Sequence, residues 1–358
     1  MKRKVAGTVD HAGFCWSFAH AVQQHVLTRG EDATSVMTAM GCAGGSGTQQ
    51  TGRRVRAMRL SAGLNEAARL LGDAQVGLRS GIAMMPSHMG ALGFAMMTAP
   101  KGIDALRLVE SLQWLVTTEW GVTHEIQGAK ILVTQTSMGK LPTDYPFWSF
   151  LAACRINLLR SACGQHLTPH LIELPCEAPT DTQALQSFMG APVRFGASVY
   201  KEWLPASPLH SPNPQGSREI HLMMQGAARR QWQALFNADE AFVVQLKRAI
   251  QQMLQDGESP TMRALSRRHT IVDASGTPLN ARQVQRRLTG MNRTFRESVA
   301  EVRRELALAQ LRSTQRPVAE IAAEAGYSEP SAFHRAVRRW TGLTPMTIRE
   351  SAKDLDKV

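Results

Sequence analysis

The clearest hydrophobic pattern in the chain lies between residues 318 and 340. A short helix is expected there after Pro317, which suits a first turn, and before Gly326, which tolerates the positive φ of a tight turn. Ser328 is expected to cap a second helix. The first helix would bury Ile321, Ala322 and Ala325, and the first turn of the second would hold Glu329 and Pro330. The pattern predicts a helix-turn-helix.

Residues 331–340 separate into two faces on a helical wheel at about 100° per residue. The inward face holds Phe333, Ala336, Val337 and Trp340, and the outward face holds Ser331, His334, Arg335, Arg338 and Arg339. A basic face can simply be solvated, but this one has no acidic residue to pair its arginines. A guanidinium fits a phosphate or the edge of guanine with two hydrogen bonds, so duplex DNA is the favoured partner.

A second helix with a basic face is expected at residues 281–290, capped by Asn280. Its inward residues would be Ala281, Val284 and Leu288, and its outward residues Arg282, Gln283, Arg286 and Arg287. Glutamine can pair with adenine and arginine with guanine in the major groove. This helix is therefore a second candidate for reading DNA.

The segment between the two candidate readers predicts one amphipathic helix. Residues 294–297 have the form of a capping box, and the helix would run to about Arg312. Its buried residues, at spacings of 4, 3, 4 and 3, would be Phe295, Val299, Val302, Leu306 and Ala309. At 1.5 Å per residue it spans about 28 Å, close to the roughly 34 Å between successive major-groove faces. It could hold the readers apart or simply be a packed bundle helix, and the two interpretations agree.

The N-terminal part of the chain predicts a mixed α/β domain. Helical stretches at 64–71 and 103–114 alternate with strand-like pieces at 129–136 and 193–195. We expect four segments in all. They are an unassigned segment at 1–58, an α/β effector domain at 59–220, a linker helix region at 221–258 and a DNA-binding domain at 259–350.

The distribution of charge supports this division, because the excess of positive charge is concentrated in the predicted DNA-binding domain. The 358 residues carry 41 Lys+Arg against 29 Asp+Glu, and residues 259–345 alone hold 15 arginines, no lysine and seven acidic residues. Such a balance attracts polyanions. No apolar stretch reaches the roughly 20 residues of a membrane helix. Five cysteines without a C-x-x-C pair suit a reducing compartment, so a cytoplasmic protein is expected.

Three strings in the last hundred residues resemble the AraC/XylS family of bacterial transcription regulators. They are VRRELALA at 302–309, PVAEIAAEAGYSEPSAFHRA at 317–336 and RWTGLTP at 339–345. The resemblance implies an all-α C-terminal domain with two helix-turn-helix subdomains joined by a long helix. The first subdomain departs from the family, since its turn at 269–278 is about eight residues longer. A surface excursion is expected, because extra loop length costs little entropy.

The N-terminal region is similar to the arabinose-binding-type regulatory domain of one branch of that family. The similarity lies in GDAQVGL at 72–78, LGFAMMTAP at 92–100, ALRLV at 105–109 and GAPVRFG at 190–196. It implies a small-molecule effector without naming one. Candidate lining residues are Met84, Met85, Met96, Met97, Trp114 and Trp120, although such residues are more often core.

Other chemistry has little support in the sequence. Cys163, His166 and His170 are only loosely spaced like metal ligands, and Pro169 interrupts them, so no metal site is expected. The chain has no G-x-S-x-G, no H-E-x-x-H and no phosphate-binding G-x-x-x-x-G-K-[ST]. We expect no enzyme, no catalytic residue and no cofactor.

The sequence thus predicts a sequence-specific DNA-binding transcription regulator under effector control. Arg335 and Arg338 should matter most in one reader and Arg282, Gln283 and Arg286 in the other. The residues expected to contact the DNA backbone are His334, Arg339 and Arg287. RNA polymerase and a second copy of the chain are further candidate partners, and activation or repression stays open. The alternatives are a non-specific architectural binder with an assembling N-terminal domain, and an enzyme with a DNA-binding appendage.

Overall fold

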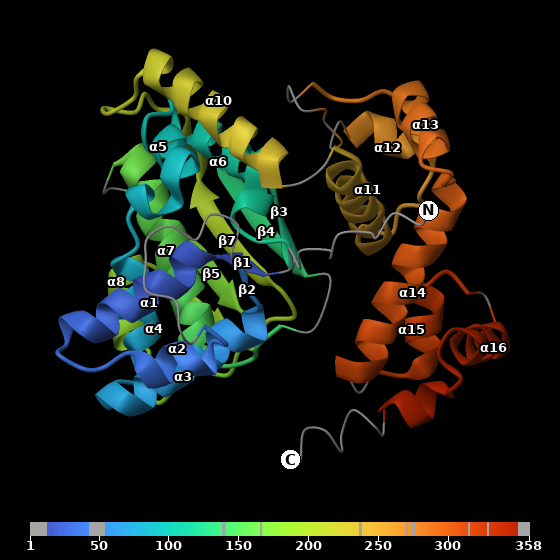
Figure 1. Ribbon diagram of the computed structural model, residues 1–358, viewed down its shortest axis with the longest axis horizontal. Helices are drawn as coiled ribbons and strands as arrows, with labels where there is room; N and C mark the ends of the chain where they lie inside the picture. The colour runs from blue at the N-terminus through green and yellow to red at the C-terminus, as the bar shows by residue number, and fades with distance from the viewer. Residues whose placement is uncertain are drawn as a thin grey trace, which may run out of the picture. The chain divides into compact units, whose positions relative to one another are not determined.

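The computed structural model divides the chain into two compact units, of which unit 1 ends at Leu235 and unit 2 holds the described residues that follow. The residues that the structure describes are 13–42, 54–137, 141–164, 167–235, 238–268, 271, 273, 277–313, 316–327 and 329–349. Unit 1 combines a sheet with helices and unit 2 is helical (Figure 1). The predicted fold class, an α/β domain followed by an all-α domain, is confirmed.

A five-stranded sheet forms the base of unit 1, with the strand order β3-β4-β7-β5-β6. Only β5 and β6 run parallel, and the other neighbours are antiparallel. The strands are β3 (Trp120–Gln127), β4 (Lys130–Ser137), β5 (Leu171–Leu174), β6 (Val193–Phe195) and β7 (Tyr200–Pro205). Alternate residues of β4 point inward, so Ile131, Val133 and Gln135 are all buried.

Helices make up most of the rest of unit 1. They are α1 (Trp16–Thr28), α2 (Thr34–Ala39), α3 (Ala57–Leu71), α4 (Val76–Ile82), α5 (Gly90–Met97), α6 (Gly102–Leu112), α7 (Tyr145–Cys163), α8 (Gln183–Met189), α9 (Ala206–His210) and α10 (Arg218–Leu235). Two 3-10 helices, η1 (Pro86–Met89) and η2 (Gln113–Leu115), join them. The central helix is α7, capped by Asp144, whose carboxylate accepts from Phe147 N at 3.2 Å. Helix α4 packs closely on α7, because a Cβ at Gly77 would lie 2.0 Å from the Pro146 carbonyl oxygen.

The segment left unassigned by its sequence belongs to the core of unit 1 where it is described. Two two-residue strands, β1 (Phe14–Cys15) and β2 (Arg54–Val55), pair antiparallel across about forty residues of chain. Phe14 is fully buried, and its ring packs edge-on against Trp120 at 4.4 Å between centroids. The first strand therefore closes one side of the domain.

Unit 2 contains two hydrophobic cores that share one helix. Its helices are α11 (Ala238–Gln255), α12 (Met262–Arg268), α13 (Ala281–Gly290), α14 (Phe295–Ser313), α15 (Val318–Glu324) and α16 (Pro330–Thr341). The first core joins α11, α12, α13 and the first half of α14, and the second joins the rest of α14 with α15 and α16. Figure 1 shows α13 near one end of α14 and α16 beside its other half.

Residues 221–258 are divided between the units. Helix α10 packs on the rest of unit 1, where Nδ1 of the buried His221 donates to the Ala95 carbonyl at 2.7 Å. The ring centroids of Trp232 and Trp114 lie 6.3 Å apart. Helix α11 instead packs in the first core of unit 2 through Phe242 and Leu246. Among the described helices, none is both long enough and apolar enough to cross a membrane.

Candidate nucleic-acid interface and ligand cavity

The turn between α15 and α16 has the geometry that its glycine predicts. Gly326 adopts φ +82°, and a Cβ there would lie 2.7 Å from the guanidinium carbon of Arg303 on α14. Pro317 occupies the N-cap of α15, and Glu329 and Pro330 are the N-cap and first residue of α16. The expectation that Ser328 is the cap, with Glu329 in the first turn, is therefore wrong, because the N-cap falls at Glu329; Ser328 itself lies outside the described residues. Ile321, Ala322 and Ala325 are buried as predicted, so the helix-turn-helix is confirmed.

Helix α16 turns its basic face outward. Phe333, Ala336 and Val337 are buried in the second core, and Trp340 packs against that core while half-buried. Within residues 331–340 the exposed side chains are those predicted, namely Ser331, His334, Arg335, Arg338 and Arg339. Across the described part of the chain, no carboxylate forms an ion pair with these three arginines, so their charge is available to a partner.

The start of α13 is fixed by a reciprocal pair of hydrogen bonds. Asn280 Oδ1 accepts from Gln283 N at 3.0 Å, and Gln283 Oε1 accepts from Asn280 N at 2.8 Å. This capping box confirms the predicted cap. It also occupies the amide oxygen of Gln283, a predicted base-reading residue, so only its amide nitrogen remains for a DNA base.

The outer face of α13 is only partly as predicted. Arg282, Gln283 and Arg286 are exposed, and Val284 and Leu288 are buried. The expectation that Arg287 also faces outward is wrong. Its side chain is 26% exposed, its guanidinium carbon lies 5.0 Å from the ring centre of Phe242, and its Nε is 3.6 Å from Asp239 Oδ1. Helix α11 covers this side of α13, and a cation over an aromatic ring is a favourable contact.

Helix α14 connects the two subdomains as predicted. Its capping box is present, since Thr294 N donates to Glu297 Oε2 at 2.8 Å and Glu297 N donates to Thr294 Oγ1 at 3.2 Å. Val302 is buried in the first core and Leu311 in the second. Each core thus packs against a different half of this helix of about 28 Å, so α14 links the two candidate readers.

The long turn before α13 is not wholly a surface excursion. Ile271 is only 2% exposed and belongs to the first core. Backbone hydrogen bonds of 2.9 Å from Asp273 N to Thr277 O and 2.8 Å from Leu279 N to Ile271 O tie the turn to itself. The remaining residues of 269–276 lie outside the described residues. Ile271 therefore helps to fix the approach of α13.

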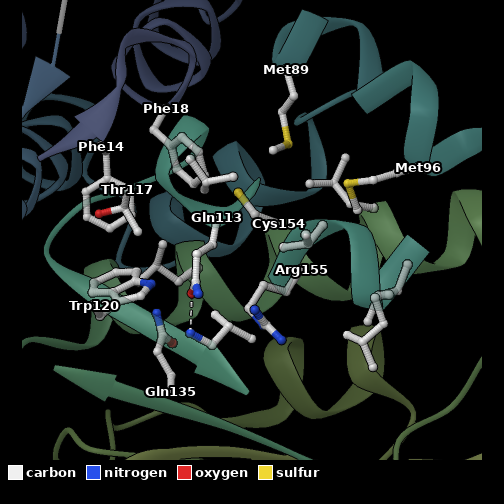
Figure 2. A pocket seen from close by; sticks show the side chains of 17 residues that line it. Phe14, Phe18, Met89, Met96, Gln113, Thr117, Trp120, Gln135, Cys154 and Arg155 are labelled. Carbon is white, nitrogen blue, oxygen red and sulfur yellow. Dashed lines mark hydrogen bonds between the residues drawn. The ribbon is translucent and has the colours of Figure 1, made fainter. Parts of the chain in front are cut away.

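Unit 1 encloses a small apolar cavity of about 60 Å³ (Figure 2). Its walls come from β1, α1, η1, α5, α6, η2, β3, β4 and α7, and include Met96 and Trp120. The other four candidates do not line it: Met84 and Trp114 are buried, Met97 is half-buried and Met85 is 53% exposed.

One charged side chain, Arg155, reaches the cavity, and its charge is compensated. Its Nε and Nη2 donate to Glu202 Oε1 at 2.9 Å and Oε2 at 3.0 Å. Burial alone would lower the pKa of Arg155, but the Glu202 carboxylate outweighs it and raises this pKa above its usual range. The Tyr200 hydroxyl donates to the same carboxylate. Arg155 therefore keeps its positive charge, and the Glu202 carboxylate lies against it as the opposite charge.

Comparison with known proteins decides the family. A family model described as "Arabinose-binding domain of AraC transcription regulator, N-term" matches residues 30–213, just over half of the chain. The chain belongs to the AraC family of transcription regulators. A helix-turn-helix domain model also matches residues 274–351 of this AraC-family chain.

Curated relatives of this AraC-family chain share parts of it. The ornithine utilization regulator of Pseudomonas aeruginosa is 30% identical over 33% of this chain and 32% of its own length. The HTH-type transcriptional regulator VqsM of the same organism is 41% identical over 23% of this chain and 25% of itself. The chain thus spans a third or less of these two relatives. An uncharacterized HTH-type transcriptional regulator of Mycobacterium tuberculosis is 24% identical over 78% of this chain and 79% of its own.

Among solved structures, the transcriptional regulator CdpR from Pseudomonas aeruginosa is similar to this AraC-family chain. The similarity covers 92% of this chain and 97% of that one, at 19% sequence identity and a TM-score of 0.44.

The structure also gathers arginines that sequence reasoning missed. A groove of about 730 Å³ in unit 2 runs along α14, and its lining includes Arg296, Arg303, Arg304 and Arg339. The first three recur at i, i+7 and i+8, which places them on one side of an AraC-family connecting helix. That spacing was the signal in the sequence, but only the fold shows that Arg339 of α16 joins them.

Cys163 and His170 belong to no candidate metal site within the described residues. Within the described part of the chain, no three His, Cys, Asp or Glu residues are grouped to hold a metal ion. His166 lies outside that part. Burial raises the pKa of the Cys163 thiol to about 11, so this thiol is a poor metal ligand at neutral pH.

Proposed function

We propose that this chain is a transcription regulator that binds a specific duplex DNA sequence through α13 and α16, under the control of a small molecule held in unit 1. The observation that carries the DNA-binding role is the outer face of α16. Arg335, Arg338 and Arg339 stand exposed there beside a buried apolar face, with no carboxylate pairing them within the described residues. Buried anchoring and free arginines are what a recognition helix needs.

Within this proposal we assign roles to the individual exposed residues. Arg335 and Arg338 contact base edges, as do Arg282 and Arg286 on α13. The amide nitrogen of Gln283 adds one donor. Residues that contact the phosphate backbone are His334 and Arg339, together with Arg296 and Arg304 of the groove along α14. Arg287 orients α13 against α11 instead of contacting DNA.

Effector control is supported by how α10 is attached. His221 of α10 bonds to Ala95, which precedes the cavity residue Met96, and Trp232 of α10 packs on Trp114, which follows the cavity residue Gln113. The chain then continues from α10 toward α11, which packs in the first core. A ligand that favours one position of α10 would shift the population of DNA-binding states.

Sequence specificity distinguishes this function from non-specific architectural binding. We expect the full chain to bind a duplex selected from a random pool about 10³-fold or more tightly than random duplex at physiological salt. Both affinities should fall as salt rises, because phosphate contacts release counterions. Filter binding or fluorescence anisotropy across salt concentrations measures both. Equal affinity for selected and random duplex would contradict sequence-specific binding and favour the non-specific architectural function.

Transcription control implies two further partners and a location. RNA polymerase is the machinery that such a regulator acts on, and a second copy of the chain would read a second half-site. The compartment is the one that holds bacterial DNA, the cytoplasm.

A further inference from the structure

The cavity of unit 1 is lined mostly by apolar side chains. Figure 2 shows the rings of Phe14, Phe18 and Trp120 on one side and the side chains of Met89 and Met96 on another. Aliphatic residues complete the wall, and they include Leu106, Val109, Leu151, Leu158 and Leu159. Methionine side chains are unbranched and adaptable, so this side of the cavity can adjust to a ligand.

Most polar groups on the wall already have partners. Arg155 is neutralised by Glu202. Gln113 Oε1 accepts from the backbone N of Val122, as the dashed line in Figure 2 marks, and Thr117 Oγ1 accepts from Glu119 N at 3.2 Å. The cavity therefore offers neither a net charge nor the several polar groups that a sugar needs.

Gln135 differs from these residues. It lies on β4 opposite Val122 of β3 and is 3% exposed, and its Oε1 has no hydrogen-bond partner among the residues that the structure describes. Figure 2 shows its side chain pointing from the strand into the cavity beside Trp120. A buried carbonyl oxygen without a donor is unfavourable, and in native proteins such an oxygen needs an explanation. A donor on a bound molecule would satisfy it.

We propose that this cavity binds an uncharged, largely apolar molecule with one hydroxyl or N–H group that donates to Gln135 Oε1. The apolar wall favours the body of such a molecule, and the single acceptor fixes its orientation. A carboxylate ligand would be desolvated without a free cation to pair it, and a polyol would bury hydroxyls without partners. That this molecule is the effector rests on the regulator function proposed above.

Four probes test the chemistry on the full chain, namely phenol, toluene, benzoate and arabinose. Phenol and toluene have nearly the same shape, and water solvates phenol better, so an apolar cavity without a free acceptor would prefer toluene. We expect ligand-observed NMR titration to show phenol binding about two- to tenfold more tightly than toluene. Benzoate and arabinose should not compete. Toluene binding as tightly as phenol, or competition by benzoate or arabinose, would overturn the assignment.

Two variants and a control locate the site. Gln135→Met should reverse the order, so that toluene binds more tightly than phenol, without lowering the melting temperature. Val109→Phe should fill the cavity and abolish binding of both probes. Gln127→Met, at an exposed position on β3, should change nothing. Phenol binding that persists in both cavity variants would place the ligand elsewhere and overturn the proposal.

The outcome is separable from the regulator function. DNA affinity of the unliganded chain depends on α13 and α16, which lie in unit 2. Specific DNA binding without phenol binding would therefore overturn the cavity assignment alone. Phenol binding without specific DNA binding would overturn the regulator function and leave the cavity assignment standing.

Discussion

The two candidate recognition helices each carry a basic face opposite a buried one, but they differ in how many of their polar side chains are held by contacts within the protein. On α16 the basic face is wholly exposed. On α13 the amide oxygen of Gln283 belongs to the capping box, and Arg287 lies over Phe242 of α11. The difference shows that an arginine on the helix face opposite the buried residues is not always exposed to a binding partner. A neighbouring helix can cover one edge of the polar face, and a long side chain will then lie along it.

The largest effect should come from removing the anchor of α16. Phe333 is fully buried in the second core, so Phe333→Ala should cost about 3 to 5 kcal/mol of that subdomain's stability. Because α13 packs in a separate core, hydrogen exchange should show protection lost in α15 and α16 and retained in α13. Equal loss in both helices would mean that the subdomains fold as one unit and would break the comparison.

A smaller effect, on DNA binding, should distinguish the exposed Arg335 from Arg287, which contacts Phe242. Arg335→Ala should weaken binding to the selected duplex by about 1 to 3 kcal/mol and relax discrimination at one base pair, with the melting temperature unchanged. Arg287→Ala is the matched control. It should lower stability by about 0.5 to 1 kcal/mol through the lost contact with Phe242. If Arg287→Ala relaxed base discrimination as Arg335→Ala does, the distinction between the helices would fail.

The smallest of the three main effects concerns the cap of α13. Asn280→Ala should destabilise the chain by about 1 kcal/mol, because Gln283 N loses its acceptor. Asn280→Asp retains an acceptor and should keep most of the stability. Thermal denaturation measures both, and identical melting temperatures for the two variants would show that the capping box contributes nothing.

Features of the C-terminal helices could be predicted because their signals are local. Gly326 and the Thr294–Glu297 box each specify a turn or helix end within a few residues. The position of Arg287 could not be predicted, since Asp239 and Phe242 lie more than forty residues earlier. Nothing near Arg287 in the sequence signals that α11 covers it.

The structure of unit 1 is harder to predict from the sequence, because it too depends on contacts between residues far apart in the chain. Phe14 and Val55 pair through strands of two residues each, too short for any periodic pattern. The cavity did leave one signal, because Ile131, Val133 and Gln135 alternate along β4 and the third inward position is polar. Recognising it requires knowing that Trp120 and Met96 face the same space, which only the fold supplies.

The sharing of α14 between two cores constrains how this protein can evolve. Inserting a single residue in the middle of that helix would turn one subdomain by roughly 100° about the helix axis relative to the other. Small insertions and deletions there would thus change the orientation of one candidate reader relative to the other. On the proposed function, single base pairs of a DNA site could vary among relatives, whereas the spacing of its two contacted segments would be set by α14.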